Sequence, residues 1–434
     1  MALGGGTFTA QNKTIPGTYI NFVSAAAASA AISDRGVATM PLELDWGIEG
    51  RVFEVSNEEY QKNSMKIFGY SVDNAKMKGL NDLFIGAKTL YAYRLNSGGT
   101  KASNEYAEAL YSGVRGNDIM IVIQDNADQT GMHDVITYLG TAKVDEQTVG
   151  KAEQLTANDY VRFKDTELST TAGTPLSGGT NGTVDGSAHQ SYINKIEPYS
   201  FNTMGVVTAD SGTKKLYAAF VKRMRDEVGV KFQLVLHDCE ADYMGVINVK
   251  NKVTDDGWAE SSLVYWVTGA QCGCAVNKSC QNKKYDGAFT VDTEYTQNDL
   301  KAAINKGEFI LHNVSGDVRV LEDINSMVTE SDTQGAVFKD NQTVRVIDQI
   351  GNDDALLFNT KYLGVVPNNA AGRISLWSDL VKIRQQLQEL GAIEEFTDKD
   401  VTVEQGDSKK SVVVNGSIQV VNAMSKVYMT ITVA

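Results

Sequence analysis

Apolar and polar side chains alternate strictly over the last residues of the chain, KVYMTITVA. Val427, Met429, Ile431 and Val433 fall on one face of this segment. A period of two, made of good β-formers, predicts a half-buried β-strand. Chain termini are usually frayed and polar, so a regular strand in this place needs a sheet to accept it. The predicted strand comprises Val427, Tyr428, Met429, Thr430, Ile431, Thr432 and Val433.

The segment before this tail predicts a β-hairpin. In VVVNGSIQVV, residues 412–421, the dipeptide Asn415-Gly416 is the strongest short-range hairpin signal. At the other end of the chain, residues 1–17 are rich in Gly, Thr and Asn and predict an extended arm. An arm of about 20 residues reaches at most roughly 70 Å. The arm leads into a short predicted strand made of Thr18, Tyr19, Ile20, Asn21, Phe22 and Val23.

Three segments show the pattern of a helix. Residues 57–69 predict a helix with Asn57 as its N-cap and Gly69 as its stop. Residues 343–364 predict a strand that turns into a helix. Residues 375–391 give the strongest signal, with Gly391 where a C′ residue belongs. The apolar stripe of this last helix consists of Leu376, Leu380, Ile383, Leu387 and Leu390, at spacings of 4, 3, 4 and 3.

A βαβ unit is predicted in the middle of the chain. Strands at 203–209 and 231–238 are joined by an amphipathic helix at 211–229, and this helical crossover implies a parallel pair. The helical segment WVTGAQCGCAV, which follows, pairs Gly269 with Gly273 at a spacing of four. That face is thin and suits close backbone packing. Together with a strand at 89–95, these elements predict a mixed α/β core.

An inserted domain is predicted between residues 97 and 195. It contains strands at 118–125 and 160–165, and its exit, residues 170–190, predicts a long flexible stretch. Its 7 Lys/Arg against 13 Asp/Glu give a net charge of −6. We therefore expect a mostly-β, solvated outer module.

Charge and hydropathy narrow the class of protein. The chain has 434 residues, 42% of them apolar and 22% charged, as in ordinary globular proteins. Its net charge of −14, with no Lys/Arg cluster larger than a pair, argues against a nucleic-acid partner. We expect no signal peptide and no membrane insertion, because the N-terminus has no apolar h-region and no apolar run reaches 18 residues. A cytoplasmic place of synthesis is therefore expected.

Motifs for catalysis or cofactors are scarce. The chain contains no P-loop, no nucleophile elbow and no three-glycine dinucleotide fingerprint. His237-Asp238, at the end of a predicted parallel strand, is the best candidate for an enzyme's site. The four cysteines include a C-x-C-x5-C cluster, Cys272, Cys274 and Cys280, but no His lies near it. We interpret these cysteines as small residues on a close-packed helix, and we expect no metal and no cofactor.

Several stretches, in a fixed order, resemble the contractile tail sheath protein family of myophages, R-type bacteriocins and related injection machines. Length and the single insertion resemble the compact sheaths of Gram-positive prophages. The stretches are SDRGVATMPLELDWG at 33–47, YSGVRGNDIMIVI at 111–123, residues 266–289, GEFILHNVSGDVRVLEDINSMVT at 307–329, residues 338–354, residues 362–380 and the final SVVVNGSIQVVNAMSKVYMTITVA.

The resemblance implies a fold and a set of partners. It implies an α/β (α+β) protein whose conserved core is built from both chain ends around one inserted domain. Subunits would form hexameric rings stacked around an inner tail tube protein, with baseplate and tail terminator proteins as further partners. Such a sheath is assembled in the bacterial host cytoplasm and belongs to the tail particle after lysis. The predicted divisions are 1–23 for the N-terminal exchange arm, 24–96 and 196–422 for the core, 97–195 for the insert and 423–434 for the C-terminal exchange strand.

The resemblance also implies roles for particular segments. The strands at 18–23 and 427–433 would be exchanged between neighbouring subunits, while contraction swings the subunits without breaking these links. The hairpin would be the acceptor, through Val412, Val413, Val414, Ile418, Val420 and Val421. The polar face of the helix at 375–391 is the candidate contact with the tube, through Asp379, Lys382, Arg384, Gln385, Gln386 and Glu389.

Two other classes of protein remain open at this point. One is a cytoplasmic α/β enzyme with its site near His237 and Asp238. The other is a secreted surface-layer or adhesin subunit, which the expected lack of a signal peptide disfavours. We expect a structural and mechanical protein without catalysis.

Overall fold

The computed structural model describes residues 32–433, in two compact units. One unit consists of residues 34–349 and 420–433, and the other of residues 350–419 with Ile32 and Ser33. The sequence prediction had placed residues 196–422 in a single core domain, and the structure divides that stretch. The predicted strand at 18–23 and the N-terminal arm lie outside the described residues.

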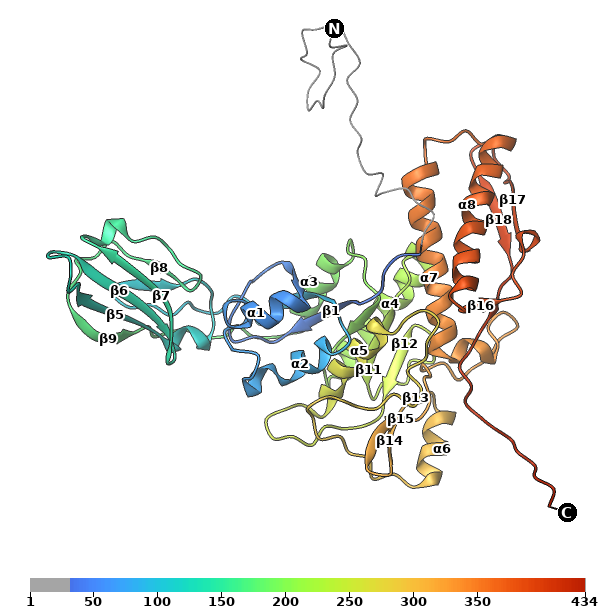
Figure 1. Cartoon of the computed structure of the whole chain (residues 1–434), viewed down its shortest axis with the longest axis horizontal. Coiled ribbons are helices and arrows are strands. Elements are labelled where there is room, and N and C mark those ends of the chain that lie inside the picture. The colour runs from blue at the N-terminus through green and yellow to red at the C-terminus, as the bar shows by residue number, and fades with distance from the viewer. Residues whose placement is uncertain (1–31, 434) are drawn as a thin grey trace, which may run out of the picture. The chain divides into compact units, whose positions relative to one another are not determined.

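A seven-stranded sheet forms the centre of the larger unit (Figure 1). Its order is β13-β12-β11-β10-β1-β3-β2, parallel throughout except for β2, which runs antiparallel to β3 at the edge. The parallel pairing of β10 with β11 confirms the predicted βαβ unit. The strands are β1 (Val37–Leu42), β2 (Val52–Ser56), β3 (Thr89–Arg94), β10 (Thr203–Gly205), β11 (Gln233–His237), β12 (Val246–Val249) and β13 (Glu308–Phe309).

Helices cover both faces of this sheet. Side chains alternate along β11, so Leu234 and Leu236 join one core cluster and Val235 joins the other. The first cluster is closed by α3 (Gly186–Ile196) and α4 (Ser211–Arg223, continued by a π-turn to Val228). The second is closed by α1 (Asn57–Phe68), α2 (Lys78–Phe84) and α5 (Val264–Gly273). This three-layer arrangement confirms the predicted α/β fold class.

The backbone of α5 lies directly against the backbone of residues 83–86, at the C-terminal end of α2. Three glycines make this close contact possible. A Cβ on Gly269 would lie 2.2 Å from the Leu83 carbonyl oxygen, and one on Gly273 would lie 2.1 Å from the Gly86 carbonyl oxygen. A Cβ on Gly86 would in turn lie 2.2 Å from the Gly269 carbonyl oxygen. The predicted thin face of this helix is therefore confirmed, and its partner is the α2 segment.

The starts of two helices differ from the prediction. The N-cap of α1 is Ser56, one residue before Asn57, and it forms a capping box with Glu59. Gly69, in the left-handed conformation at φ 82°, ends α1 as predicted. Residues 343–364 do not start as a strand, because α7 (Asn341–Leu357) is helical from its first residue. The Asp340 carboxylate accepts a hydrogen bond from the Thr343 amide at 3.0 Å, which supplies the start signal.

The inserted domain is a small β structure. Four strands form a sheet in the order β7-β6-β5-β9, and β4 pairs with β8. The exit is not a flexible stretch as predicted, since β9 pairs with β5 and α3 begins at Gly186. The strands are β4 (Ala107–Ala109), β5 (Ile119–Asp125), β6 (His133–Leu139), β7 (Ala142–Val149), β8 (Val161–Phe163) and β9 (Thr171–Pro175).

Trp46 joins the inserted domain to the rest of its unit. It is fully buried and lies in the cluster of the insert, with its ring 5.3 Å from that of Tyr111 and 6.3 Å from that of Tyr160. Its indole N–H donates to the Lys66 carbonyl of α1 at 3.2 Å. A hairpin of β14 (Leu311–Val314) and β15 (Asp317–Val320), together with α6 (Gln297–Asn305), completes the larger unit.

The smaller unit is built on α8 (Ala370–Glu389), which follows the C-terminal half of α7. The helix starts five residues before the predicted Ser375, because Asn369 caps it by accepting a hydrogen bond from the Gly372 amide. Four of the five predicted apolar residues are buried, but Leu390 is 48% exposed because it is the C-cap residue. The remaining strands are β16 (Ile393–Glu394), β17 (Val401–Gln405), β18 (Val412–Gly416) and β19 (Gln419–Val420).

The glycine contact gives a test of the fold. Gly→Ala in a helix normally stabilises, but Gly269→Ala must push two backbones apart. We expect it to lower the free energy of unfolding by about 1–3 kcal/mol. Gly335→Ala is the matched control, because that site has φ −83° and nothing within 4 Å of a new Cβ. Thermal unfolding that shows Gly269→Ala as stable as the control would contradict the close contact.

Candidate functional site: the assembly surfaces

The C-terminal tail is anchored at its root by α7. The Gln342 side chain donates to the Val421 carbonyl at 3.0 Å and accepts from the Ala423 amide at 2.9 Å. The Asn422 side chain donates to the Thr343 hydroxyl at 3.1 Å. These contacts fix the point at which the tail leaves its own unit.

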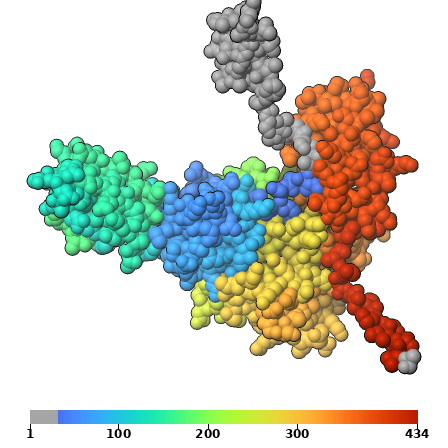
Figure 2. Space-filling view, in the orientation of Figure 1, coloured from blue at the N-terminus to red at the C-terminus, as the bar shows by residue number. Residues whose placement is uncertain are grey.

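Beyond Ala423 the tail is extended and exposed. Val427 is 83% exposed, Met429 72%, Ile431 73% and Val433 90%, and Tyr428 on the opposite face is 92% exposed. Figure 2 shows these last residues as a thin extension of the chain. Within residues 32–433, no strand pairs with them. The residues of the predicted strand are therefore exposed, and no sheet within the described residues accepts them.

The predicted hairpin at 412–421 is wrong. Strand β18 runs through Asn415 and Gly416, which lie opposite Thr402 and Val401 of β17. Neither Asn415 nor Gly416 has the positive φ that a type I′ turn requires. The turn lies at residues 406–411 instead, where the Ser411 hydroxyl accepts from the Ser408 amide at 2.9 Å. Pairing with β17 has overridden the local preference of the dipeptide.

The β17–β18 ribbon leaves two strand edges unpaired within the described residues. The Trp377 indole of α8 donates to the Val401 carbonyl at 2.9 Å and holds the ribbon against this helix. Val413 and Val414 are 44% and 43% exposed. Two-stranded ribbons are marginally stable in water, so a ribbon with open edges is suited to accept further strands. Of the predicted acceptor residues, Val412, Val413 and Val414 lie in this ribbon, and Ile418, Val420 and Val421 lie beyond it.

The polar face of α8 is present, with one correction. Lys382, Gln385 and Glu389 are exposed, whereas Arg384 is 7% exposed and forms a bidentate ion pair with Asp354, at 2.7 and 2.5 Å. Arg384 lies four residues after Leu380 and so falls on the buried stripe. Its partner Asp354 lies inside α7.

The other two candidate tube residues on α8 are half-buried. The Asp379 carboxylate accepts from Lys361 Nζ at 2.5 Å and from the Tyr362 hydroxyl. The Gln386 side chain accepts from the Ile32 amide at 3.2 Å. Both side chains therefore have partners inside their own unit. The exposed polar residues of the predicted face are Lys382, Gln385 and Glu389.

The smaller unit also has an apolar groove that was not predicted from the sequence. It is lined by Phe358, Tyr362, Leu363, Pro367, Leu376 and Val412. Nearby, Leu356 is 56%, Val365 74% and Ile374 63% exposed. The available signal was the density of apolar residues in LLFNTKYLGVVP, which exceeds what one stripe of a helix needs.

The candidate enzymatic residues do not form a catalytic arrangement. Burial lowers the pKa of His237, and its Nε2 has no hydrogen-bond partner. Around it, Lys250 pairs with Glu308 at 3.0 Å and Lys252 pairs with Glu260 at 2.8 Å. Over the described chain, no three His, Cys, Asp or Glu residues are placed to hold a metal ion. None of the described helices is both long and apolar enough to cross a bilayer.

Four family models match the chain in succession. They are described as tail sheath protein Gp18 domain III N-terminal region (35–95), phage tail sheath protein beta-sandwich domain (97–181), phage tail sheath protein central domain (182–326) and phage tail sheath C-terminal domain (333–434). A sheath tail protein from Desulfitobacterium hafniense is 36% identical, and the likeness covers 95% of this chain and 99% of that one at a TM-score of 0.82. The chain belongs to the phage tail sheath protein family.

Other relatives agree with this assignment. The phage-like element PBSX protein XkdK of Bacillus subtilis is 33% identical, over 99% of this chain and all of the relative. The contracted helical sheath of the anti-feeding prophage shares the fold, with 12% identity and a TM-score of 0.58 over 97% of this chain and 99% of that one. The chain is thus a structural subunit of a tail sheath and not an enzyme, as predicted. The strand exchange, its acceptor and the tube contact stay predictions.

Proposed function

We propose that this sheath protein polymerises as stacked hexameric rings around an inner tail tube and contracts to drive that tube through the target cell envelope. The observation that carries the proposal is the tail, a regular apolar strand that finds no sheet in the described chain. Two solved structures with the same fold are a contracted helical sheath and a baseplate of the anti-feeding prophage. We also propose that the sheath binds a baseplate and a tail terminator protein, and that it is assembled in the host cytoplasm.

The proposed link between subunits is strand exchange through the tail. Each backbone hydrogen bond that Val427–Val433 gains in a partner sheet contributes about 0.5–1.5 kcal/mol net. Burial of a side chain such as Met429 or Ile431 adds about 1.5–3 kcal/mol. Because the root of the tail is held by Gln342 while the strand itself is free, the link can stay intact as subunits swing.

The proposed acceptor is the β17–β18 ribbon of a neighbouring subunit. This revises the predicted acceptor, since only Val412, Val413 and Val414 of that set lie in the ribbon. A strand added to either open edge would satisfy the unpaired N–H and C=O groups of both partners. We propose that the strand predicted at residues 18–23 is also donated to a neighbouring subunit.

The proposed tube contact is the exposed face of α8. Polar contacts suit a surface that must release the tube on contraction, since exposed ion pairs contribute only about 0.2–1 kcal/mol each. Summed over many subunits, such contacts hold an extended state whose interfaces differ from those of the contracted state.

The first prediction concerns the tail. Deletion of residues 427–434 is expected to leave a folded, soluble monomer that no longer forms tubes or rings in negative-stain electron microscopy. As point variants, Ile431→Asp is expected to block assembly, because it puts a charge on the apolar face of the strand. Thr432→Asp, on the opposite face, is the matched control and is expected to assemble. Normal tubes from the truncated chain would refute strand exchange through this tail.

The second prediction concerns the inserted domain. The Gly182 amide donates to the Asn96 carbonyl at 3.1 Å, so the two ends of the insert are adjacent. Replacement of residues 99–181 by a short Gly/Ser linker, with Trp46→Gln to avoid an uncovered indole, is expected to preserve tube formation. The Trp46→Gln variant of the full chain is the control for stability. A core that unfolds normally but does not assemble would show that the insert makes an essential contact.

The third prediction concerns α8. Lys382→Glu combined with Gln385→Glu adds negative charge to an exposed face without touching the Arg384–Asp354 pair. We expect unchanged sheath polymerisation and a loss of extended sheath on the tube, counted in electron micrographs. Lys399→Glu, a charge change outside α8, is the control. Extended particles at the normal frequency would show that an element other than α8 makes the tube contact.

A further inference from the structure

A short loop follows the C-terminal end of α5, with Cys274 at its start and Cys280 at its end. Both cysteines are free thiols. Cys274 is half-buried and its Sγ donates to the Lys278 carbonyl at 3.4 Å. Cys280 is buried and its Sγ donates to the Ala270 carbonyl at 3.6 Å. The Lys278 amide donates to the Ala275 carbonyl at 3.0 Å, and this turn brings Cys280 back to the end of α5, where its Sγ lies against the carbonyl one helical turn before Cys274.

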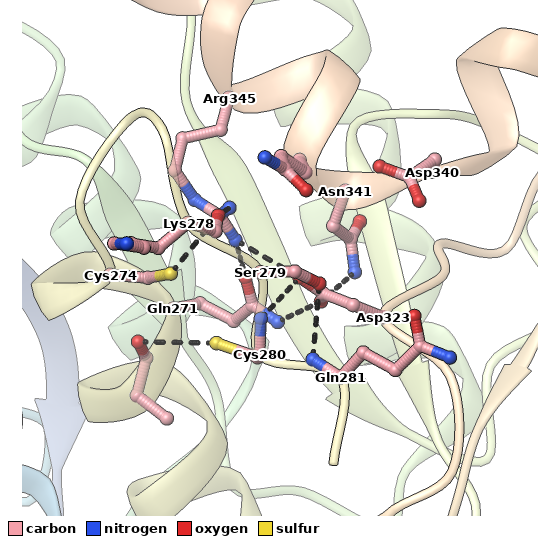
Figure 3. A network of polar contacts seen from close by, with 12 residues as sticks. Gln271, Cys274, Lys278, Ser279, Cys280, Gln281, Asp323, Asp340, Asn341 and Arg345 are labelled. Carbon is pink, nitrogen blue, oxygen red and sulfur yellow. Dashed lines mark hydrogen bonds and ion pairs between the residues drawn. The ribbon is translucent and has the colours of Figure 1, made fainter. Parts of the chain in front are cut away.

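Two arginines, Arg345 and Arg35, contact this loop, and Figure 3 shows the contacts of Arg345. The Arg345 guanidinium donates to the Lys278 carbonyl and to the Gln271 side chain, at 2.6 Å each, and pairs with Asp323 at 3.3 Å. Arg35 donates to the Cys274 carbonyl at 2.9 Å and so caps the carbonyl end of α5. The Asp323 carboxylate in turn accepts from the Cys280 amide at 2.8 Å. Positive charge on two sides favours a thiolate at Cys274.

The four cysteines of the chain therefore differ in reactivity. The neighbouring Cys280 side chain, together with Arg345 and Arg35, lowers the pKa of Cys274 to about 7. The Cys274 side chain and burial raise the pKa of Cys280. Burial raises the pKa of Cys272 to about 12 and also raises that of Cys239. Near neutral pH, Cys274 is the thiol that supplies a nucleophilic thiolate.

We propose that Cys274 and Cys280 form a reversible dithiol–disulfide pair, in which Cys274 is the thiol that reacts with low-molecular-weight disulfides and Cys280 is the resolving thiol. This inference does not depend on the proposed assembly.

The exchange proceeds in two steps. The Cys274 thiolate attacks one sulfur of a disulfide RSSR, forms a mixed disulfide and releases RS⁻, which takes up a proton as RSH. The mixed disulfide carries no charge, so the neighbouring Cys274 anion no longer opposes the loss of the Cys280 proton. Cys280 then loses its proton to solvent and attacks the Cys274 sulfur, which releases the second RS⁻. Two protein thiols are oxidised and one RSSR is reduced to two RSH.

The disulfide would staple a loop that lies on a buried polar network. Arg345, Asp323 and Asn341 tie this loop to the start of α7, with Asn341 donating to Asp323 at 3.0 Å. A cross-link across the loop removes freedom mainly from the unfolded chain. Oxidation is therefore expected to raise the unfolding temperature by a few degrees, and a reductant should reverse the shift.

Peptide mapping tests the pairing. Trypsin cleaves after Lys278 and separates Cys274 from the peptide 279–283, in which Cys280 is the single cysteine. After treatment of the native full chain with oxidised glutathione, we expect residues 253–278 and 279–283 to run as one disulfide-linked mass. Cys274→Ser should abolish this mass, and Cys239→Ser, the control, should leave it unchanged. Absence of the linked mass from the native protein, or its persistence in Cys274→Ser, overturns the proposal.

Alkylation rates test the order of reactivity without a variant. With a limiting amount of iodoacetamide on the native protein, Cys274 should react first, at a rate that rises with pH and levels off above a midpoint of about 7. Cys239 should react at least tenfold more slowly at pH 7. Equal or faster labelling of Cys239 would contradict the proposed role of Cys274.

Discussion

An unpaired β-strand cannot satisfy its own backbone, and this constraint governs how the sheath protein is built. The N–H and C=O groups of Val427–Val433 have no partner strand in the described chain, and the apolar side chains between them are more than 70% exposed. Water can hydrogen-bond such a backbone, but the strand pairs with a ladder and buries its apolar face only where a further sheet accepts it, and we propose that a neighbouring subunit supplies that sheet. In the proposed assembly each subunit thus completes its neighbour, which is the property that a polymer of identical subunits requires.

The rest of the larger unit supplies the rigidity that such a link needs. Two helices on one face of the central sheet, α2 and α5, are held together by backbone contact at Gly86, Gly269 and Gly273, where no side chain can intervene. The tail leaves this unit beside the start of α7, where Arg345 and Asp323 are paired and fully buried. Breaking such a pair by removing one partner is strongly destabilising, so the root of the tail is held firmly. A rigid body with a firmly rooted but free strand can transmit a swing to its neighbour.

Sequence alone predicted the elements whose pattern is local. The apolar strands of the central sheet, the thin face of α5 and the stop of α1 at Gly69 were all confirmed. The errors fell where tertiary contacts decide. The β-branched start of α7 forms a helix because its buried Arg345 and Asp348 find ionic partners in Asp323 and Arg225. Asn415-Gly416 runs straight because β17 pairs with it, and Arg384 is buried because Asp354 neutralises it. In each case the deciding partner is distant in sequence, and a periodic pattern cannot reveal it.

Amide hydrogen exchange of the tail tests the central claim most directly. Backbone amides of residues 427–433 should exchange at the rate of an unstructured peptide in the monomer, because no strand pairs with them there. In the assembled sheath they should be protected by at least a hundredfold, since strand exchange satisfies them in the sheet of a neighbour. Amides that remain unprotected in the polymer, or that are already protected in the monomer, would contradict the account.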